Sequence, residues 1–184
     1  SFYIDIVDNE KNILMLYDFP HPDFSALKSS IQLDQQYNIS VYRRADFKKN
    51  IFDYDLVILY QCDFNYDVIS KLNKKNIPIW YIIGSMSNFS RLNDLQKTIY
   101  FKDRSNEFKD IYVNYEDSFQ KFKLDKNIIE MINSYPPLFS TENFEIQSDV
   151  KVLIGKKNLN NKIKKPIWFF SNDNQDCFFI SEGI

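Results

Sequence analysis

The chain is poor in cysteine and histidine, carries no excess of positive charge and contains no long apolar run. Its two cysteines, Cys62 and Cys177, are too few for a disulfide framework, and both adjoin apolar runs, as ordinary half-buried thiols do. With His21 as the single histidine, a zinc site would have to be completed by carboxylates. The net charge of −2 offers no basic surface for nucleic acid, and no apolar run approaches the roughly 18–20 residues that span a bilayer. We therefore expect no metal, no cofactor, no nucleic-acid partner and no direct membrane insertion by this segment.

Core-forming residues, in contrast, are abundant. Hydrophobic residues make up 44% of the 184 residues and aromatic residues 17%, which is enough for one domain with a sizeable core. Because the sequence opens at Ser1 without a methionine and stops soon after a strand-like segment, we expect a piece of a longer protein. Residues 1–11 are predicted to be the tail of an upstream domain or a linker strand. Residues 12–184 are predicted to form one α/β domain, truncated at its C-terminus.

The most informative stretch is Asn76–Leu92 (NIPIWYIIGSMSNFSRL), which predicts a strand, a tight turn and a helix. Pro78 suits the first residue of a strand, and the unbroken apolar run Ile79–Ile83 is typical of a strand covered on both faces. Gly84 ends the run and tolerates the positive φ that a sharp turn uses. The turn would present amide groups and a hydroxyl at the carboxyl edge of a sheet, where ligands bind in α/β proteins. Three residues then qualify as helix N-caps: Ser85, Ser87 and Asn88.

The rest of the chain repeats a strand-then-helix pattern. Three further apolar segments predict strands before the central one, at Ile13–Tyr17, Tyr37–Tyr42 and Phe52–Tyr60. Helices are predicted between them at Asp23–Leu33, with Asp23 or Ser25 as the N-cap, and at Asp67–Asn73. A later strand is predicted at Val150–Ile154, followed by a hairpin of Pro166–Phe170 and Cys177–Ile180, while Ile99–Ser148 has no single interpretation beyond partly helical spacing in Phe119–Ile132.

These elements predict a three-layer, doubly wound, mostly parallel α/β sheet with a C-terminal β-hairpin. The strand order is expected to be flavodoxin-like, 2-1-3-4, so that the loops after strands one, three and four share one edge. That edge is the predicted binding edge, and it would gather His21, Asp23, Asp63, Gly84, Ser85, Ser87 and Asn88.

Two resemblances follow from these residues. The buried strand that enters a sharp turn after Pro78 resembles class I glutamine amidotransferases. Five pieces more specifically resemble the C-terminal region of bacterial membrane-anchored proteins that also carry a von Willebrand factor A domain: KNILMLYDFPHPDFSALK (Lys11–Lys28), FDYDLVILYQ (Phe52–Gln61), IPIWYIIG (Ile77–Gly84), SYPPLFS (Ser134–Ser140) and SEGI (Ser181–Ile184). This resemblance implies a soluble domain of a membrane-anchored bacterial protein, with other domains of the same polypeptide, or another protein, as partners.

The residues depart from a working amidotransferase at the reaction site. Such an enzyme resembles G-I-C-L-G at the turn, with a histidine and a glutamate late in the chain. Placing Pro78 on the corresponding proline puts Ile83 or Gly84 at the nucleophile position, and no histidine follows His21. Since a thiolate nucleophile needs an adjacent base, the resemblance implies the fold while the residues argue against the activity. The leading prediction is therefore a non-catalytic binding or scaffolding module.

Two catalytic or switching alternatives remain open at this point. The first is a serine hydrolase with Ser85 as nucleophile, His21 as base and Asp18 or Asp23 as the orienting carboxylate, although helix capping also explains a serine at position 85. The second is a Mg²⁺-dependent, receiver-like switch, in which Gln61 would stand where a phospho-acceptor aspartate is expected. Its candidate residues are Asp18, Asp63, Asp67, Ser85 and Lys156.

Overall fold

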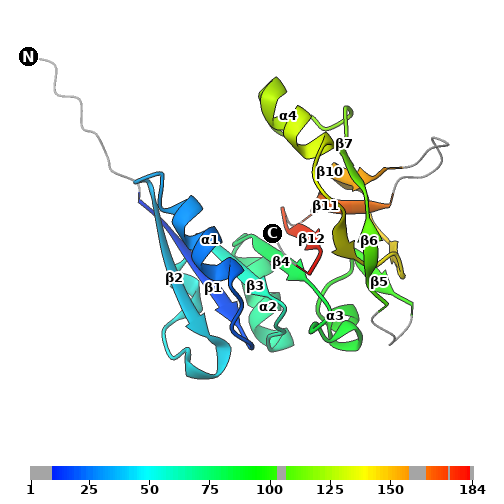
Figure 1. Ribbon diagram of the computed structural model, residues 1–184. Helices are drawn as coiled ribbons and strands as arrows, with labels where there is room; N and C mark the ends of the chain where they lie inside the picture. Colours follow the sequence, from blue (N-terminus) through cyan, green and yellow to red (C-terminus); the bar gives the residue numbers. More distant parts are fainter. Residues whose placement is uncertain (1–9, 103–106, 158–164, 174, 183–184) are drawn as a thin grey trace, which may run out of the picture.

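The computed structural model describes residues 10–102, 107–157, 165–173 and 175–182. Most of the strands in these ranges belong to one eight-stranded sheet, and Figure 1 shows how the elements are arranged. The strand order is β2-β1-β3-β4-β12-β11-β10-β7. Neighbouring strands are parallel from β2 to β12 and antiparallel from β12 to β7. The bounds are β1 Lys11–Tyr17, β2 Tyr37–Arg43, β3 Leu56–Tyr60, β4 Ile79–Ile83, β7 Val113–Tyr115, β10 Val150–Lys156, β11 Pro166–Ser171 and β12 Cys177–Ile180.

Four helices and two small strand pairs complete the fold. The helices are α1 (Asp23–Ile31), α2 (Tyr66–Lys74), α3 (Phe89–Leu95) and α4 (Lys126–Asn133), with short 3₁₀ turns at Arg44–Asp46 and Ile51–Asp53. In the region that the sequence left open, β5 (Ile99–Phe101) pairs with β9 (Phe144–Ile146), and β6 (Lys109–Ile111) pairs with β8 (Leu138–Ser140). Residues 1–9 of the predicted upstream tail lie outside the described residues, and β1 begins at Lys11.

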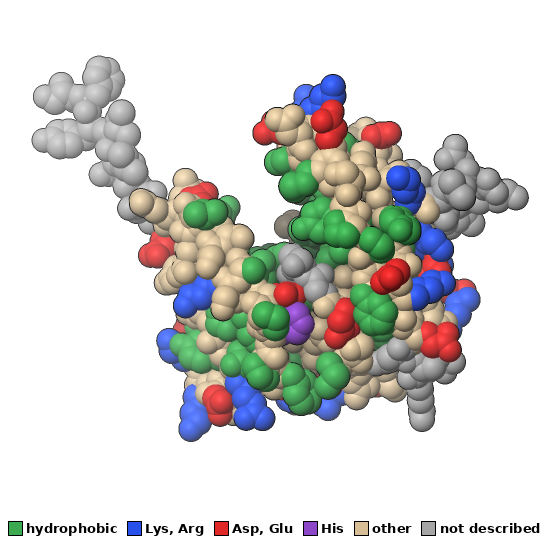
Figure 2. Space-filling model, in the orientation of Figure 1, with side chains coloured by type: hydrophobic (Ala, Val, Ile, Leu, Met, Phe, Trp, Pro, Cys, Tyr) green, Lys and Arg blue, Asp and Glu red, His purple; other side chains and the backbone are tan. Residues whose placement is uncertain are grey.

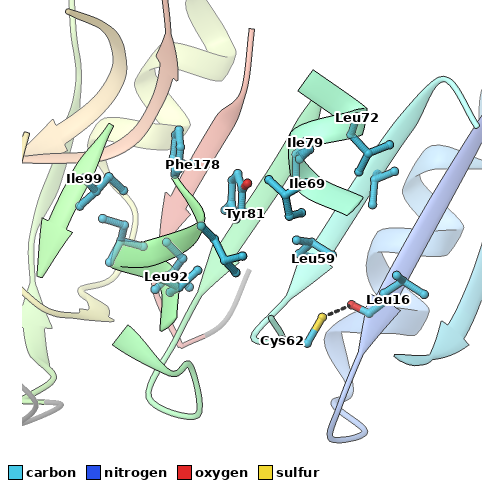
Figure 3. Close-up of a cluster of buried hydrophobic side chains, with 14 of the residues drawn as sticks. Leu16, Leu59, Cys62, Ile69, Leu72, Ile79, Tyr81, Leu92, Ile99 and Phe178 are labelled. Atoms are coloured by element: carbon cyan, nitrogen blue, oxygen red, sulfur yellow. Dashed lines mark hydrogen bonds between the residues drawn. The ribbon is translucent and has the colours of Figure 1, made fainter. Parts of the chain in front are cut away.

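Two hydrophobic clusters cover the two faces of the sheet. Alternate residues of a strand point to opposite faces, so Leu14 and Leu16 pack on the face with α2 and α3, while Ile13 and Met15 pack on the face with α1. Figure 3 shows the first cluster, in which Tyr81 and Phe178 stack with ring centroids 4.9 Å apart. The predicted three-layer, doubly wound arrangement and the 2-1-3-4 order are both confirmed. Both features could be predicted from local sequence patterns. Unbroken apolar runs form central strands, and apolar residues at a period of 3.6 mark the helices that cover them.

Several local predictions were wrong. Helix α1 follows Pro22 and has no side-chain cap, so neither Asp23 nor Ser25 caps it. Strand β3 is shorter than predicted, because residues near its start form the second 3₁₀ turn. The prediction of partly helical spacing in Phe119–Ile132 was right, because α4 covers its second half.

The predicted C-terminal hairpin is confirmed, and its place in the sheet is a finding of the structure. Strands β11 and β12 are antiparallel neighbours, with Phe169 opposite Phe178. Strand β12 also lies beside β4 and parallel to it, so the end of the chain is a central strand of the sheet. Sequence periodicity does not contain this long-range pairing. The pairing of β12 with β4 determines which residues lie next to the turn after β4.

Candidate functional site

The carboxyl ends of β1, β3, β4 and β12 share one edge of the sheet. The strand registers pair Tyr17 with Tyr60, Tyr60 with Ile82, and Ile83 with Ile180. The amide of Ser181 then donates to the carbonyl of Ile83 at 2.9 Å, which extends β12 alongside β4. This places Glu182 against the turn that follows β4. The binding edge predicted from the sequence therefore gains a residue from the far end of the chain.

Glu182 holds Ser85 through both of its carboxylate oxygens. The Ser85 amide donates to Oε2 at 2.5 Å, and the Ser85 hydroxyl donates to Oε1 at 2.8 Å. A carboxylate is a strong acceptor, and two bonds to one residue fix its geometry. The hydroxyl that the hydrolase alternative would use as nucleophile therefore donates its hydrogen bond to Glu182.

Gln61 occupies the other side of the same turn. Its backbone has φ of 46°, its side chain is buried, and its Oε1 accepts from the Met86 amide at 3.0 Å. Gly84 does not use the positive φ that glycine tolerates, and Gln61 carries that conformation instead. Gly84 is needed for space, since a Cβ there would lie 2.4 Å from the Gln61 amide carbon.

The other two N-cap candidates, Ser87 and Asn88, make different hydrogen bonds. The Ser87 hydroxyl accepts from the Gly84 amide at 3.1 Å, and the Asn88 side chain caps α3 by accepting from the Arg91 amide at 3.1 Å. The amides of three consecutive residues, Gly84, Ser85 and Met86, therefore all donate to side chains of this chain. A turn of this kind has no preorganised donors left for a substrate anion or oxyanion.

His21 lies at the same edge but belongs to a different cluster. Its Nδ1 is 2.9 Å from the Tyr60 hydroxyl and accepts from the Asp23 amide at 3.3 Å. The Tyr60 hydroxyl donates to Asp23 Oδ2 at 2.9 Å, and burial together with Asp23 raises the pKa of Tyr60. None of these contacts joins His21 to Ser85.

Two of the three aspartates proposed for a Mg²⁺ pocket are paired with arginines. Asp18 accepts from Arg44 at 2.8 Å, and Asp63 lies 3.3 Å from Arg91. The bond to Asp18 raises the pKa of the Arg44 guanidinium, with a further contribution from Asp63. Asp67 stands in the first turn of α2 and donates its amide to Asn65, and Lys156 bonds to Glu142. Within the described ranges, no three His, Cys, Asp or Glu side chains gather as a metal ion would require.

The cysteines are not activated. The Cys62 thiol donates to the Leu16 carbonyl at 3.2 Å (Figure 3), and burial raises its pKa. Burial also raises the pKa of Cys177 to about 12. Catalytic thiols have lowered pKa values, so neither group is suited to nucleophilic attack.

Glu182 and Tyr60 lie at this edge and were not predicted there from the sequence, which considered Gln61 only as the residue in place of a phospho-acceptor aspartate. Ser85 and Glu182 are 97 residues apart, and only the pairing of β12 with β4 joins them. A polar residue that directly follows a buried strand is the one available signal, since such residues lie at sheet edges. It identifies Gln61 after β3, and once β12 is assigned beside β4 it would identify Ser181, with Glu182 one residue further on.

Comparison with known proteins adds a fold likeness. No protein-family model and no curated protein matches the chain. The structure is similar to that of a Thermoplasma acidophilum protein described as a candidate component of GMP synthase, with 13% identity and a TM-score of 0.49. The match covers 92% of this chain and 82% of that one. At this identity and TM-score the likeness is one of overall fold, and it carries no argument about family or activity. In the part of the chain that is described, no helix has the length and hydrophobicity to cross a bilayer.

Proposed function

We propose that this chain is a non-catalytic, amidotransferase-like module that binds an acidic amphipathic helix of a partner domain, within a larger membrane-anchored bacterial protein. The observation that carries the proposal is an apolar groove beside α4. The turn after β4 supports the non-catalytic part of the proposal, since its amides and the Ser85 hydroxyl donate to Gln61, Ser87 and Glu182.

Helix α4 presents a strongly one-sided apolar surface without a buried residue of its own. Ile128 is 38% exposed and Met131 54% exposed, and both border a groove of about 310 Å³ whose floor includes Trp168 and Phe179. Figure 2 shows hydrophobic side chains gathered below α4, next to a hollow that separates this part from the part with α1 and β2. An exposed apolar surface of this kind is typical of a protein-binding site, and an amphipathic helix is the element that fits a groove.

The charges beside the groove favour an acidic partner. In residues 121–126, exposed lysines alternate with the groove-lining Phe122 and Leu124. With Glu130 of α4, which lies 3.7 Å from Lys126, three lysines stand against two carboxylates: Lys121, Lys123, Lys126, Asp125 and Glu130. Complementary charges at the rim of a groove fix the orientation of the bound helix and speed its association.

Binding is tested with two synthetic amphipathic peptides that share a leucine face and differ in having glutamate or lysine on the polar face. We expect the glutamate peptide to bind the wild-type chain in fluorescence anisotropy, and to bind Ile128→Asp at least about tenfold more weakly. Asn127→Asp adds the same charge to the neighbouring position of α4 and should leave the affinity within about twofold. Equal binding of both peptides, or an unaffected Ile128→Asp variant, would overturn the proposal.

Absence of catalysis is tested by covalent labelling with a serine-directed fluorophosphonate and, separately, with a glutamine-analogue electrophile. Wild type is compared with Ser85→Ala, His21→Ala and Glu182→Ala. We expect no labelling of the folded protein by either probe. Serine labelling that disappears in both Ser85→Ala and His21→Ala would make this chain a hydrolase.

A further inference from the structure

A second pocket lies at the opposite end of the sheet, where β4 and β12 begin. It has a volume of about 500 Å³ and lies between α2 and the residues that follow α3. Small-molecule sites in proteins occupy roughly 300–1,000 Å³, so the size suits a small ligand. Its lining mixes apolar surface with polar side chains, among them Asn73, Ser148, Ser171 and Asp176. Nothing in the proposed helix-binding function uses this pocket.

Asp176 is the most deeply buried charged group of the pocket. The residue is 2% exposed, and its Oδ1 accepts one hydrogen bond, from the Ile79 amide at 2.9 Å. The described residues supply its carboxylate with no second hydrogen bond. Burial raises the pKa of Asp176 to about 7, against the lowering effect of the Ile79 bond. A carboxylate desolvated in this way gains from a positive charge placed beside it.

Three more buried polar atoms in this region lack partners among the described residues. Asn73 Oδ1 and Ser148 Oγ belong to pocket-lining residues, and neither has a hydrogen bond. The Tyr81 hydroxyl is also unpartnered, and it lies close enough to Asp176 for that carboxylate to raise the pKa of Tyr81, in addition to burial. Unsatisfied buried polar atoms are uncommon in native proteins, and a cluster of them around one pocket indicates a missing partner.

The chemistry of the lining selects among ligands. Asn73 Oδ1 can only accept a hydrogen bond, as can an ionised Asp176, so the partner must supply N–H or O–H donors. The charged residues of the lining are three aspartates and two lysines, which favours a cation: Asp94, Asp173, Asp176, Lys74 and Lys97. Since no three metal-binding side chains gather among the described residues, an organic cation fits better than a metal ion.

We propose that this pocket binds a small organic cation with a primary ammonium or guanidinium group, which pairs with Asp176 and donates to Asn73 Oδ1 and Ser148 Oγ. Asp176 is the counter-ion, and the amide and hydroxyl oxygens fix the orientation of the donor group.

Agmatine, which carries both cationic groups, is the probe, and isothermal titration calorimetry is the measurement. We expect saturable one-site binding to wild type and at least about tenfold weaker binding to Asp176→Asn, because the isosteric amide removes the counter-ion. Asp46→Asn makes the same charge change at an exposed position and should bind as wild type does. Asn73→Leu should also weaken binding, through the loss of one acceptor.

The pH dependence of agmatine affinity distinguishes pairing with the Asp176 carboxylate from binding to a polar surface in general. With a pKa of about 7 for Asp176, the ionised fraction falls about tenfold between pH 8 and pH 6, and agmatine affinity should fall by the same factor. The other charged and titratable groups around Asp176 are Tyr81, Cys177, Lys74, Lys97, Asp94 and Asp173. No binding to wild type, unchanged binding to Asp176→Asn, or equally tight binding of the neutral 1,5-pentanediol would overturn the assignment. A crystal soaked in agmatine at pH 8 that shows only ordered water against Asp176 would do so as well.

Discussion

A methyl group on Gly84 would lie 2.4 Å from the side-chain amide of Gln61. The two residues follow neighbouring parallel strands, and the Gln61 side chain fills the space above Gly84 while it accepts from the Met86 amide. The turn after β4 is therefore built around a side chain from the turn after β3. This relationship, rather than the φ angle of the glycine, makes the glycine necessary.

Gly84→Ala should destabilise the fold by about 2 kcal/mol, because the buried Gln61 amide must move and lose its bond to Met86. Urea unfolding followed by circular dichroism measures the change. In a Gln61→Gly background, where glycine also suits the positive φ, the same substitution should cost less than half as much. Equal costs in the two backgrounds would show that Gln61 is not the obstacle.

Glu182→Ala should destabilise the fold by about 2 kcal/mol, because it leaves the Ser85 amide and hydroxyl without their acceptor. Ser85→Ala removes only the hydroxyl bond and should cost about 1 kcal/mol. Thermal unfolding of the two single variants and of the double variant checks this. In the double variant the costs should be less than additive, since both changes break the same interaction.

Asn88→Ala should cost about 1 kcal/mol, the usual effect of losing a side-chain N-cap. The Ser87→Ala change tests the neighbouring assignment, because Ser87 bonds to Gly84 and not to the first turn of α3. Hydrogen exchange of the α3 amides distinguishes the two. Only Asn88→Ala should speed exchange at Arg91, whose amide donates to the cap.

Asp176 should make the stability of the unliganded protein decrease as pH rises. Burial raises the folded-state pKa from 3.8 to about 7, so the folded state binds more protons than the unfolded state between these values. The stabilisation is fully present below about pH 4 and is lost as pH rises through about 7. At pH 8, Asp176→Asn should therefore be more stable than wild type, by an amount on the order of 4 kcal/mol.

Denaturant unfolding of both proteins at pH 5 and pH 8 checks this dependence. The advantage of Asp176→Asn should be clearly smaller at pH 5, where wild-type Asp176 is mostly protonated in the folded state. An advantage that does not change with pH would contradict a raised pKa at Asp176.

Much of the fold was predictable because its signals are local. The runs at Ile13–Tyr17 and Ile79–Ile83 are apolar without alternation, which is a property of central parallel strands and requires no knowledge of distant residues. Helix α2 was equally clear, since Ile69 and Leu72 mark its buried side at helical spacing. By contrast, residues 99–148 form three-residue strands that pair with distant segments, and strands so short leave almost no periodic pattern.

The candidate site was only half predictable. His21, Ser85 and Asn88 follow predicted strands, so the sequence alone determined that they lie near one edge. What each of them contacts depends on residues far along the chain: Tyr60 for His21, Glu182 for Ser85.

The amino-acid sequence by itself determined the layers of this protein, the order of its first four strands and the absence of a thiol at the turn after β4. Tertiary structure alone decided that β12 enters the sheet beside β4, that Glu182 and Gln61 occupy that turn, and that Asp176 is buried at the other end of the same strand pair. The physical reason is the range of the interactions. Burial preferences act between residues a few positions apart, whereas strand pairing and side-chain hydrogen bonds join residues that the chain brings together only when it folds.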